Sequence, residues 1–463
     1  MLAVLLTGGF LPPVDFFIVN VALPSIQHGL AATPAQVQLV ISGYAGAYAV
    51  FLVTGGRLGD LFGHRRMFML AMLAFTAASA LCGLAASPGL LVLARVAEGL
   101  AAALLVPQVL GAIRALHDAP GQEAALARAI GFYGMMVGLA AAAGQLGGGV
   151  LVAWSPLGLG WRAVFLVNLP IGAAALAGAW VLLPETAAPR RPRLDLVGAA
   201  LLSATLIALI VPLSEGRQAG WPPWTWLTLA AVPVLLWGFL RFEARLAAQG
   251  GMPLLDPALL RIPGFRRGVL VASLFFFTSA FYLLFAIERQ DGAGLDPLRT
   301  GLAILPYGIG LFVGPMAGAR LAARLRPRLL GLGLAIEVAG YAATGLAVAA
   351  GVGGAGLVAP VFVAGFGQGV AMPLLFTLVL AEVPARQGGV AAGVVNSVLQ
   401  IGAAVSVAAI GSLFFAVLGA GRGGPAYAHA FGVAMIAITA ALAGAALLAR
   451  RSRRERRRER RTP

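Results

Sequence analysis

The chain has 463 residues, of which 60% are hydrophobic and 11% charged, and its formal net charge is +16. A soluble domain carries about 25% charged residues, so the composition excludes a soluble globular enzyme and indicates a protein with many membrane spans. The single cysteine excludes an intramolecular disulfide, and the lack of any lysine excludes a Walker A nucleotide site.

Apolar windows long enough to cross a membrane recur along the whole chain. We expect fourteen spans, at about 3–25, 36–57, 67–87, 89–112, 127–152, 161–183, 194–213, 223–241, 268–287, 300–322, 329–350, 355–380, 389–417 and 430–449. Most loop arginines lie in alternate loops and in the C-terminal segment, so the positive-inside rule places both termini in the cytoplasm. No basic segment precedes the first apolar run, so we expect no secretory signal peptide.

Two longer polar interruptions, at 184–195 and 242–267, divide the spans into groups of six, two and six. We therefore expect an all-α polytopic membrane protein of five parts. These are an N-terminal six-helix bundle at 1–185, a linker with two extra transmembrane helices at 186–245, a cytoplasmic loop at 246–267, a C-terminal six-helix bundle at 268–449 and a basic cytoplasmic tail at 450–463. The segments RLGDLFGHRR (57–66) and RLAARLRPRL (320–329) resemble each other, as expected for the internal repeat of a secondary transporter. The alternative is that short basic loops resemble one another because the positive-inside rule acts on all of them.

The first span, LLTGGFLPPVDFFIVNVALP, contains Asp15 near its middle. A charge at that depth costs about 2.5 kcal/mol or more and marks a functional residue by default. We expect Asp15 to carry a proton or to pair with a cationic substrate; the alternative is a hydrogen bond that only holds a neighbouring helix. On the fourth span, Arg95 and Glu98 lie one turn apart on one helical face. They form either a self-neutralising pair or a proton relay in which protonation of Glu98 frees Arg95.

Three motifs resemble those of the major facilitator superfamily: GGRLGDLFGHRR (55–66) its loop signature, LARVAEGLAAA (93–103) its fourth-helix motif and VDFFIVNVALP (14–24) its first-helix motif. The last, together with WRAVFLVNLPIG (161–172), is typical of the fourteen-span drug:proton antiporters. The resemblance implies a major facilitator fold with two six-helix bundles plus two inserted helices. It also implies that Arg95 takes part in proton coupling.

The resemblance assigns a conformational role to the loop signature, which closes the inner side in that family. Its residues here are Gly56, Arg57, Gly59, Asp60, Gly63, Arg65 and Arg66. An antiporter-like motif on the fifth span is represented by Gly131, Gly144, Gln145 and Gly148. Gln145 replaces the family's proline, which removes a kink, places an amide at a helix interface and weakens the antiport assignment.

The ninth span is rich in aromatic residues (274–285) and, by analogy with the family, lines the substrate cavity. Aromatic rings attract lipophilic cations, although packing is the alternative role for these side chains. The expected cavity residues are Phe16, Phe17, Asn20, Phe277, Phe281, Tyr282, Gln368, Asn396 and Gln400. Glu337, on the eleventh span, is expected to be peripheral and paired with nearby arginines.

These features together predict a proton-coupled secondary transporter in the cell membrane that exports lipophilic or cationic drugs, or a natural product, by alternating access and so confers antibiotic resistance. An importer or facilitator with the same fold is the alternative. Clustered acids or histidines of a membrane enzyme are lacking, so we expect no catalytic or metal site and no cofactor besides the proton gradient. The expected partners are a small-molecule substrate, protons and membrane lipids, with no nucleic acid. A monomer is compatible with the sequence. The sequence leaves the oligomeric state, the identity of the substrate and the proton stoichiometry open.

Overall fold

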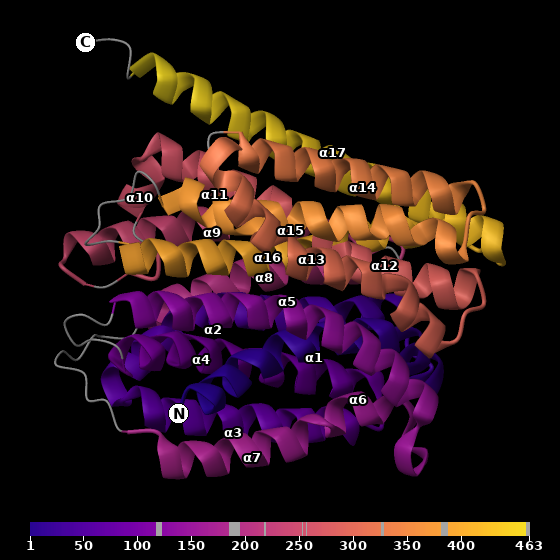
Figure 1. Cartoon of the computed structure of the whole chain (residues 1–463), viewed down its shortest axis with the longest axis horizontal. Helices are drawn as coiled ribbons and strands as arrows, with labels where there is room; N and C mark the ends of the chain where they lie inside the picture. Colours follow the sequence, from indigo (N-terminus) through magenta and orange to yellow (C-terminus); the bar gives the residue numbers. More distant parts are fainter. Residues whose placement is uncertain are drawn as a thin grey trace. The chain divides into compact units, whose positions relative to one another are not determined.

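The structure, a computed structural model, is helical throughout the regular elements that it describes (Figure 1). It describes residues 1–116, 123–184, 195–216, 219–251, 253–255, 257–325, 328–380 and 388–459. Within these ranges, it does not describe the side chains of 53, 57, 60, 114, 115, 123, 124, 126–128, 130, 131, 134, 135, 137, 138, 141, 214, 322–324, 376–378, 380, 388–394, 396, 397, 400 and 450–459.

The chain divides into two compact units, Met1–Leu254 and Leu255–Pro463. Unit 1 contains α1 (Leu2–Leu30), α2 (Pro34–Phe62), α3 (His64–Gly83), α4 (Pro88–Leu116), α5 (Glu123–Trp154), η1 (Pro156–Gly158), η2 (Gly160–Arg162), α6 (Ala163–Leu166), α7 (Asn168–Leu182), α8 (Leu196–Glu215) and α9 (Pro223–Ala248). Unit 2 contains α10 (Pro257–Arg261), α11 (Pro263–Phe275), η3 (Phe276–Ser279), α12 (Ala280–Ile287), η4 (Glu288–Gly292), α13 (Pro297–Leu325), α14 (Leu329–Ala349), η5 (Gly354–Leu357), α15 (Val358–Leu380), α16 (Gly388–Leu418) and α17 (Gly424–Glu459).

Thirteen helical segments among the described residues are long and apolar enough to cross a membrane, judged by length and composition. They coincide with thirteen of the fourteen expected spans, and α5 covers the remaining one at 127–152. The sixth expected span is assembled from η2, α6 and α7, and the ninth from α11, η3, α12 and η4. The prediction of an all-helical polytopic protein is confirmed.

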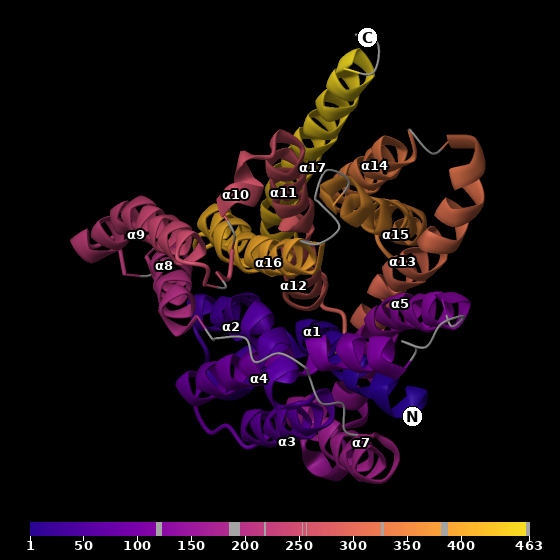
Figure 2. The same cartoon turned by 90° about the vertical axis from the view of Figure 1, so that its left-hand side faces the viewer.

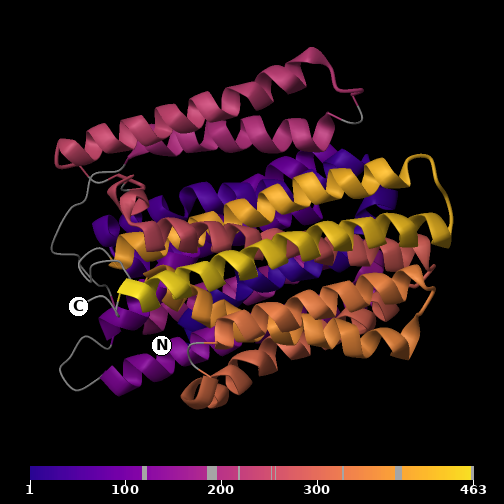
Figure 3. The same ribbon diagram turned by 90° about the horizontal axis from the view of Figure 1, so that it is seen from above.

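The two helices that the sequence assigns to a linker, α8 and α9, belong to unit 1. They lie side by side, and α8 packs against α2 (Figures 2 and 3). Only three residues of α9 are buried: Thr225, Phe239 and Glu243. Its exposed tryptophans, such as Trp226 and Trp237, are of the type enriched at membrane interfaces.

The helices of each unit pack in the same order, as the internal repeat predicts. In unit 1 the most extensive contacts join α2 to α4, α1 to α5 and α3 to α4, and α3 also packs against α7. In unit 2, α13 packs against α15, α14 packs against α15 and α17, and the segment from α11 to α12 packs against α16. The second helix of each unit therefore meets the fourth, the third meets the fourth and sixth, and the first meets the fifth.

Matching glycines make the contact between the second and fourth helices close in both units. Gly99 on α4 lies against the backbone of Tyr44 on α2, and Gly365 on α15 lies against the backbone of Tyr307 on α13. A Cβ atom on either glycine would collide with that backbone, which is why small residues are enriched at such membrane interfaces. The shift in residue number from Tyr44 to Tyr307 is the same as that from Arg57 to Arg320 in the sequence alignment of the repeat.

Two glycines of the fifth-span motif serve the packing of α5 on α1. A Cβ atom on Gly144 would lie 2.8 Å from the carbonyl oxygen of Val14, and one on Gly148 would lie 2.6 Å from that of Ile18. Both distances are shorter than a normal carbon–oxygen contact. The motif glycines therefore allow the backbones of the two helices to approach.

Gly63, between α2 and α3, has φ 90° and ψ 136°, a conformation that strains any residue with a Cβ atom. We expect Gly63→Ala to lower the free energy of unfolding by about 1–3 kcal/mol, the usual cost of such strain. The control is Gly56→Ala inside α2, where the new Cβ atom would make an ordinary 3.6 Å contact with Pro107. Thermal unfolding of both variants in detergent checks this, and equal stability of the two would contradict it.

Candidate functional site

The carboxylate of Asp15 lies in the interior of unit 1, where it forms an ion pair with Arg95. Both side chains are fully buried, and Arg95 Nη1 donates a hydrogen bond to Asp15 Oδ2. The same Nη1 donates to Glu98 Oε2 at 2.7 Å, and Arg95 Nε donates to the carbonyl oxygen of Val40 at 3.2 Å. The structure thus brings together the three residues that the sequence singled out for proton coupling.

Side chains from three further helices enclose this cluster. Asn168, on α7, donates from Nδ2 to Asp15 Oδ1 at 3.1 Å and to Ser79 Oγ at 3.0 Å. Ser79, on α3, donates in turn to the carbonyl oxygen of Phe165. The ring of Tyr44, on α2, lies 4.2 Å from the guanidinium carbon of Arg95, close enough for a cation–π interaction.

Asn168, Ser79 and Tyr44 were not among the residues expected at the site. Asn168 falls inside the quoted segment WRAVFLVNLPIG, where it is the one amide in an apolar run. A buried amide needs a hydrogen-bond partner, which was the available signal that it faces a polar centre. The positions of Ser79 and Tyr44 depend on how the helices pack, which sequence periodicity does not specify.

The charge balance of the cluster is unequal, since two carboxyl groups share one guanidinium. With all three groups ionised the enclosed site carries one net negative charge, and one bound proton makes it neutral. Among the described residues, Arg95 Nη2 and Glu98 Oε1 are buried and have no hydrogen-bond partner. An uncompensated buried charge is costly, so this arrangement favours the binding of one proton.

Four expected residues lie on α1 and α5 near the cluster. Phe16 and Phe17 contact each other edge to face, and the ring centroid of Phe16 lies 6.2 Å from that of Tyr44. Asn20 donates to the carbonyl oxygen of Phe16 at 2.6 Å, and its side-chain oxygen has no partner among the described residues. Gln145 is fully buried next to the α1–α5 contact at Gly144, and neither atom of its amide has a described partner.

The loop signature at the end of α2 is held against α4. Gln108 Nε2 donates to the carbonyl oxygens of Gly55 at 2.7 Å and Leu104 at 2.9 Å, and Gln108 Oε1 lies 2.9 Å from His64 Nδ1. Gly59 lies directly against these two side chains. Gln108 is therefore an additional residue that fixes this loop. The side chains of the expected residues Arg57 and Asp60 lie outside the described residues.

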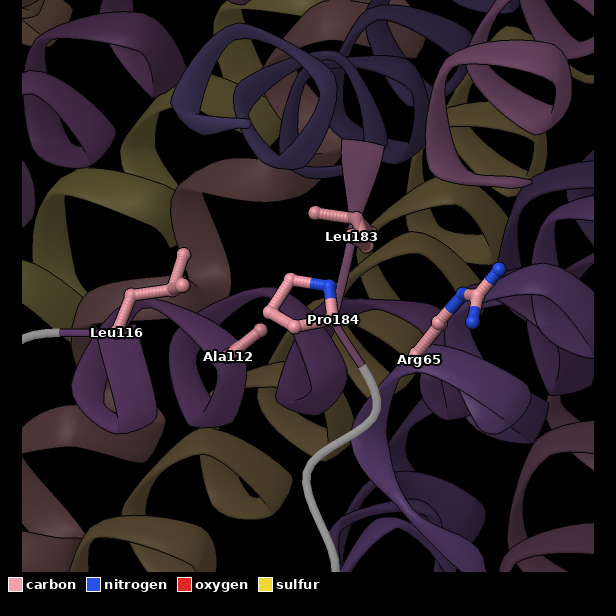
Figure 4. Close-up of a pocket in the computed structure, with 5 residues that line it drawn as sticks. All are labelled: Arg65, Ala112, Leu116, Leu183 and Pro184. Atoms are coloured by element: carbon pink, nitrogen blue, oxygen red, sulfur yellow. The ribbon is translucent and has the colours of Figure 1, made fainter. Parts of the chain in front are cut away.

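Arg65 connects the loop signature to the end of α7. Its Nη2 donates to the carbonyl oxygen of Trp180 at 2.6 Å, which satisfies a carbonyl in the last turn of that helix. Arg65 also lines a small pocket with four residues of unit 1: Ala112, Leu116, Leu183 and Pro184 (Figure 4). Arg66 is exposed. Arg65 therefore holds the end of α7 in place and does not belong to the charged cluster.

In unit 2, several expected cavity residues lie in a buried aromatic and polar cluster. Phe281 is fully buried, and its ring centroid lies 5.4 Å from that of Tyr307 and 5.1 Å from that of Tyr341. Tyr307 OH donates to Gln368 Oε1 at 2.6 Å, and Tyr282 also contacts this amide oxygen at 3.5 Å. This cluster links α12, α13, α14 and α15, and it includes two tyrosines that were not predicted.

The remaining expected residues are less informative. Phe277 is half-buried. Gly131 lies in a part of α5 outside the described side chains, as do the side chains of Asn396 and Gln400 on α16. No group of three or more histidine, cysteine or acidic residues in the described part of the chain is placed to hold a metal ion.

The expectation for Glu337 is wrong. The residue is fully buried in unit 2, and neither carboxyl oxygen has a hydrogen-bond partner in the described part of the chain. It lies on the face of α14 that also buries Gly340 and Tyr341, and Gly367 of α15 packs against its backbone. None of the arginines in the described part of the chain pairs with it, and α15 covers this face of α14.

The helical topology and the buried intramembrane charges define a secondary transporter, and comparison with known proteins gives the family. The profile of the Major Facilitator Superfamily matches residues 5–407. The chain belongs to this superfamily, which confirms the expectation of a transporter and not an enzyme.

Two relatives and one solved structure show the extent of the similarity. The chain is 40% identical over 423 residues to the "Probable actinorhodin transporter" of Streptomyces coelicolor, covering 90% of this chain and 72% of the relative. It is 33% identical over 420 residues to the "Tetracenomycin C resistance and export protein" of Streptomyces glaucescens, covering 89% and 75%. The crystal structure of a bacterial homologue of the human lysosomal transporter Spinster has a TM-score of 0.70 at 19% identity, with 98% of this chain and 96% of that chain covered, and supports the fold alone.

The charge balance of the cluster predicts unequal effects of removing its members. Arg95→Gln leaves two carboxyl groups without a cation, so we expect a loss of about 3–5 kcal/mol in the free energy of unfolding, as for other broken buried ion pairs. Asp15→Asn leaves Arg95 balanced by Glu98, so we expect the smaller loss of about 1.5–3 kcal/mol that accompanies one hydrogen bond to a charged group. Thermal unfolding in detergent compares them, and a greater loss for Asp15→Asn would contradict this charge count.

Proposed function

We propose that the protein exports drugs or a natural product across the cell membrane in exchange for protons, which bind at the Asp15–Arg95–Glu98 cluster. The observation that carries this proposal is the enclosed site in which two carboxyl groups share one arginine. Such a site takes up one proton to become neutral when it is buried and releases the proton when it opens to water. The proton gradient is then the energy source, and no cofactor is needed.

The names of the relatives support the direction of transport and the class of substrate. Two of them are named as an actinorhodin transporter and as a tetracenomycin C resistance and export protein. A natural product or drug moving outward is therefore the best-supported cargo for this chain. A substrate that is a lipophilic cation also fits, because binding near Asp15 would compete directly with Arg95 and with the proton.

The orientation and the setting of the protein follow from the arginines. Their concentration in alternate loops and in the C-terminal segment supports cytoplasmic termini, the cell membrane as its location and contact with membrane lipids. All members of the charged cluster come from one chain, so a monomer is sufficient for proton binding. An importer with the same fold remains the competing function, since the fold does not set the direction of transport.

Transport by the purified protein in liposomes tests the proposal. The liposomes enclose a pH dye, and ethidium is added outside as a lipophilic cation. For an antiporter, ethidium entry drives protons out, so we expect the lumen to become alkaline. Asp15→Asn and Glu98→Gln should remove the proton that the cluster carries and so lower the proton movement for each ethidium, because each leaves the cluster neutral without a proton.

The matched control is Glu288→Gln. Glu288 is also a buried carboxylate paired with an arginine, Arg289, but it lies in unit 2 and outside the charged cluster. We expect this variant to couple normally. Acidification of the lumen would indicate symport and therefore the importer, and ethidium movement without any proton signal, or normal coupling in Asp15→Asn, would contradict the proposal.

A further inference from the structure

Unit 2 buries a carboxyl group that has no described partner and that the proposed function does not use. Glu337 on α14 has no exposed surface, and both of its carboxyl oxygens lack a hydrogen-bond partner in the described part of the chain. Gly367 on α15 packs against its backbone, and Gly340, one turn away, packs against Ala364. The side chain therefore lies at the most closely packed side of α14.

The sequence supplies no positive charge near Glu337. Within unit 2, the segments 268–287, 300–319, 329–336, 338–380, 388–417 and 430–449 contain no arginine, lysine, histidine or acidic residue. Glu337 is thus the one charged residue in the central parts of these spans; Glu288 and Arg289, in η4 at the end of one span, pair with each other. The nearest described arginine in sequence, Arg328, is exposed at the start of α14, and Arg320 is exposed near the end of α13.

The groups that face Glu337 from the neighbouring helices are neutral. The helix α14 packs against α15 and α17, and less extensively against α13 and η5. The titratable groups in the membrane parts of these elements are tyrosines: Tyr341 one turn away on α14, Tyr307 on α13 and, beyond it, Tyr282 on α12. α15 and η5 have no ionisable side chain, and α17 has Tyr427 and His429 near its start and the arginines and glutamates of the basic segment from residue 450 to its end. An isolated buried carboxylate is strongly disfavoured in such surroundings, so Glu337 must be protonated in this conformation.

The hydroxyl and amide groups next to Glu337 already satisfy one another. Tyr307 OH and Tyr341 OH are 2.6 Å apart, Tyr307 donates to Gln368, and Gln368 Nε2 donates to Thr278 Oγ1 at 3.1 Å. The residue shift that relates Tyr44 to Tyr307 also relates Asp15 to Thr278. This polar cluster therefore occupies the position in unit 2 that the charged cluster occupies in unit 1, and Glu337 borders it.

We propose that Glu337 is a second proton-binding site of the transport cycle, which holds its proton while buried and releases it in a conformation that exposes α14 to water. The proposal rests on the proton-coupled function proposed above. In this conformation the carboxyl group makes no described hydrogen bond or ion pair, so it contributes less to stability than an apolar side chain of the same size would. Its presence is explained by a conformation in which it ionises.

Labelling with dicyclohexylcarbodiimide, an apolar reagent that modifies protonated carboxyl groups, tests the site without a substrate. The purified wild-type protein in lipid is treated at pH values from acidic to alkaline, and mass spectrometry of the peptide containing residue 337 gives the modified fraction. We expect Glu337 to be modified at acidic pH, because the opened conformation exposes its protonated carboxyl group to the reagent. The modified fraction should decrease to background as the pH rises, because the exposed carboxyl group then ionises. No modification at any pH, or a modified fraction that is independent of pH, would overturn the proposal.

A second measurement counts the protons exchanged for each ethidium in the liposome assay. We expect Glu337→Gln to halve this number, because one of two sites is lost while Asp15 and Glu98 still couple. The matched control is Thr344→Val, which removes a buried hydroxyl group from the same helix. This hydroxyl donates to the carbonyl oxygen of Gly340 within α14, so the variant should leave the proton count unchanged. An unchanged count in Glu337→Gln would overturn this inference alone, whereas the absence of proton exchange in the wild type would overturn the proposed function.

Discussion

The buried ion pair between Asp15 and Arg95 is the interaction on which the organisation of unit 1 depends. It joins α1 to α4 across the interior, and Asp15 could not be buried in its ionised form without Arg95, because it would leave an uncompensated charge. The close backbone contact of Gly99 with Tyr44 brings α2 near enough for the tyrosine ring to cover the guanidinium. Asn168 brings in α7 through its bond to Asp15. The glycine contact and the hydrogen bond therefore both help to enclose the ion pair of Asp15 and Arg95.

Unit 2 has the same order of helix contacts but a different chemistry at the corresponding place. Tyr307, Gln368 and Thr278 form a neutral hydrogen-bonded cluster where unit 1 has charges. A repeated fold thus carries a charged centre in one copy and an uncharged one in the other. The second carboxyl group of the cluster in unit 1 and the isolated Glu337 of unit 2 share one property. Each can be buried at low cost only when a carboxyl group carries a proton.

The sequence predicted the class of fold and the three charged residues, because hydropathy and the cost of intramembrane charge act locally and can be read without knowing the packing. It did not predict that Asp15 pairs with Arg95 across two helices, nor the contribution of Ser79, Asn168 and Tyr44, because these depend on the rotation of each helix about its axis. The error at Glu337 has the same origin. A glutamate near the inner end of a span was assigned to the nearest arginines in sequence, whereas glycines at 340 and 367 turn it toward α15.

Infrared spectroscopy of the purified protein in lipid distinguishes protonated from ionised carboxyl groups and so tests most directly whether Asp15 and Glu98 share one proton. The wild type at neutral pH should show one protonated carboxyl group at the cluster, above the constant contribution of Glu337. Asp15→Asn and Glu98→Gln should each remove this signal completely, because the remaining acid is ionised beside Arg95, and Arg95→Gln should double it. A signal that survives unchanged in both single variants would show that the cluster holds no shared proton and would contradict the account.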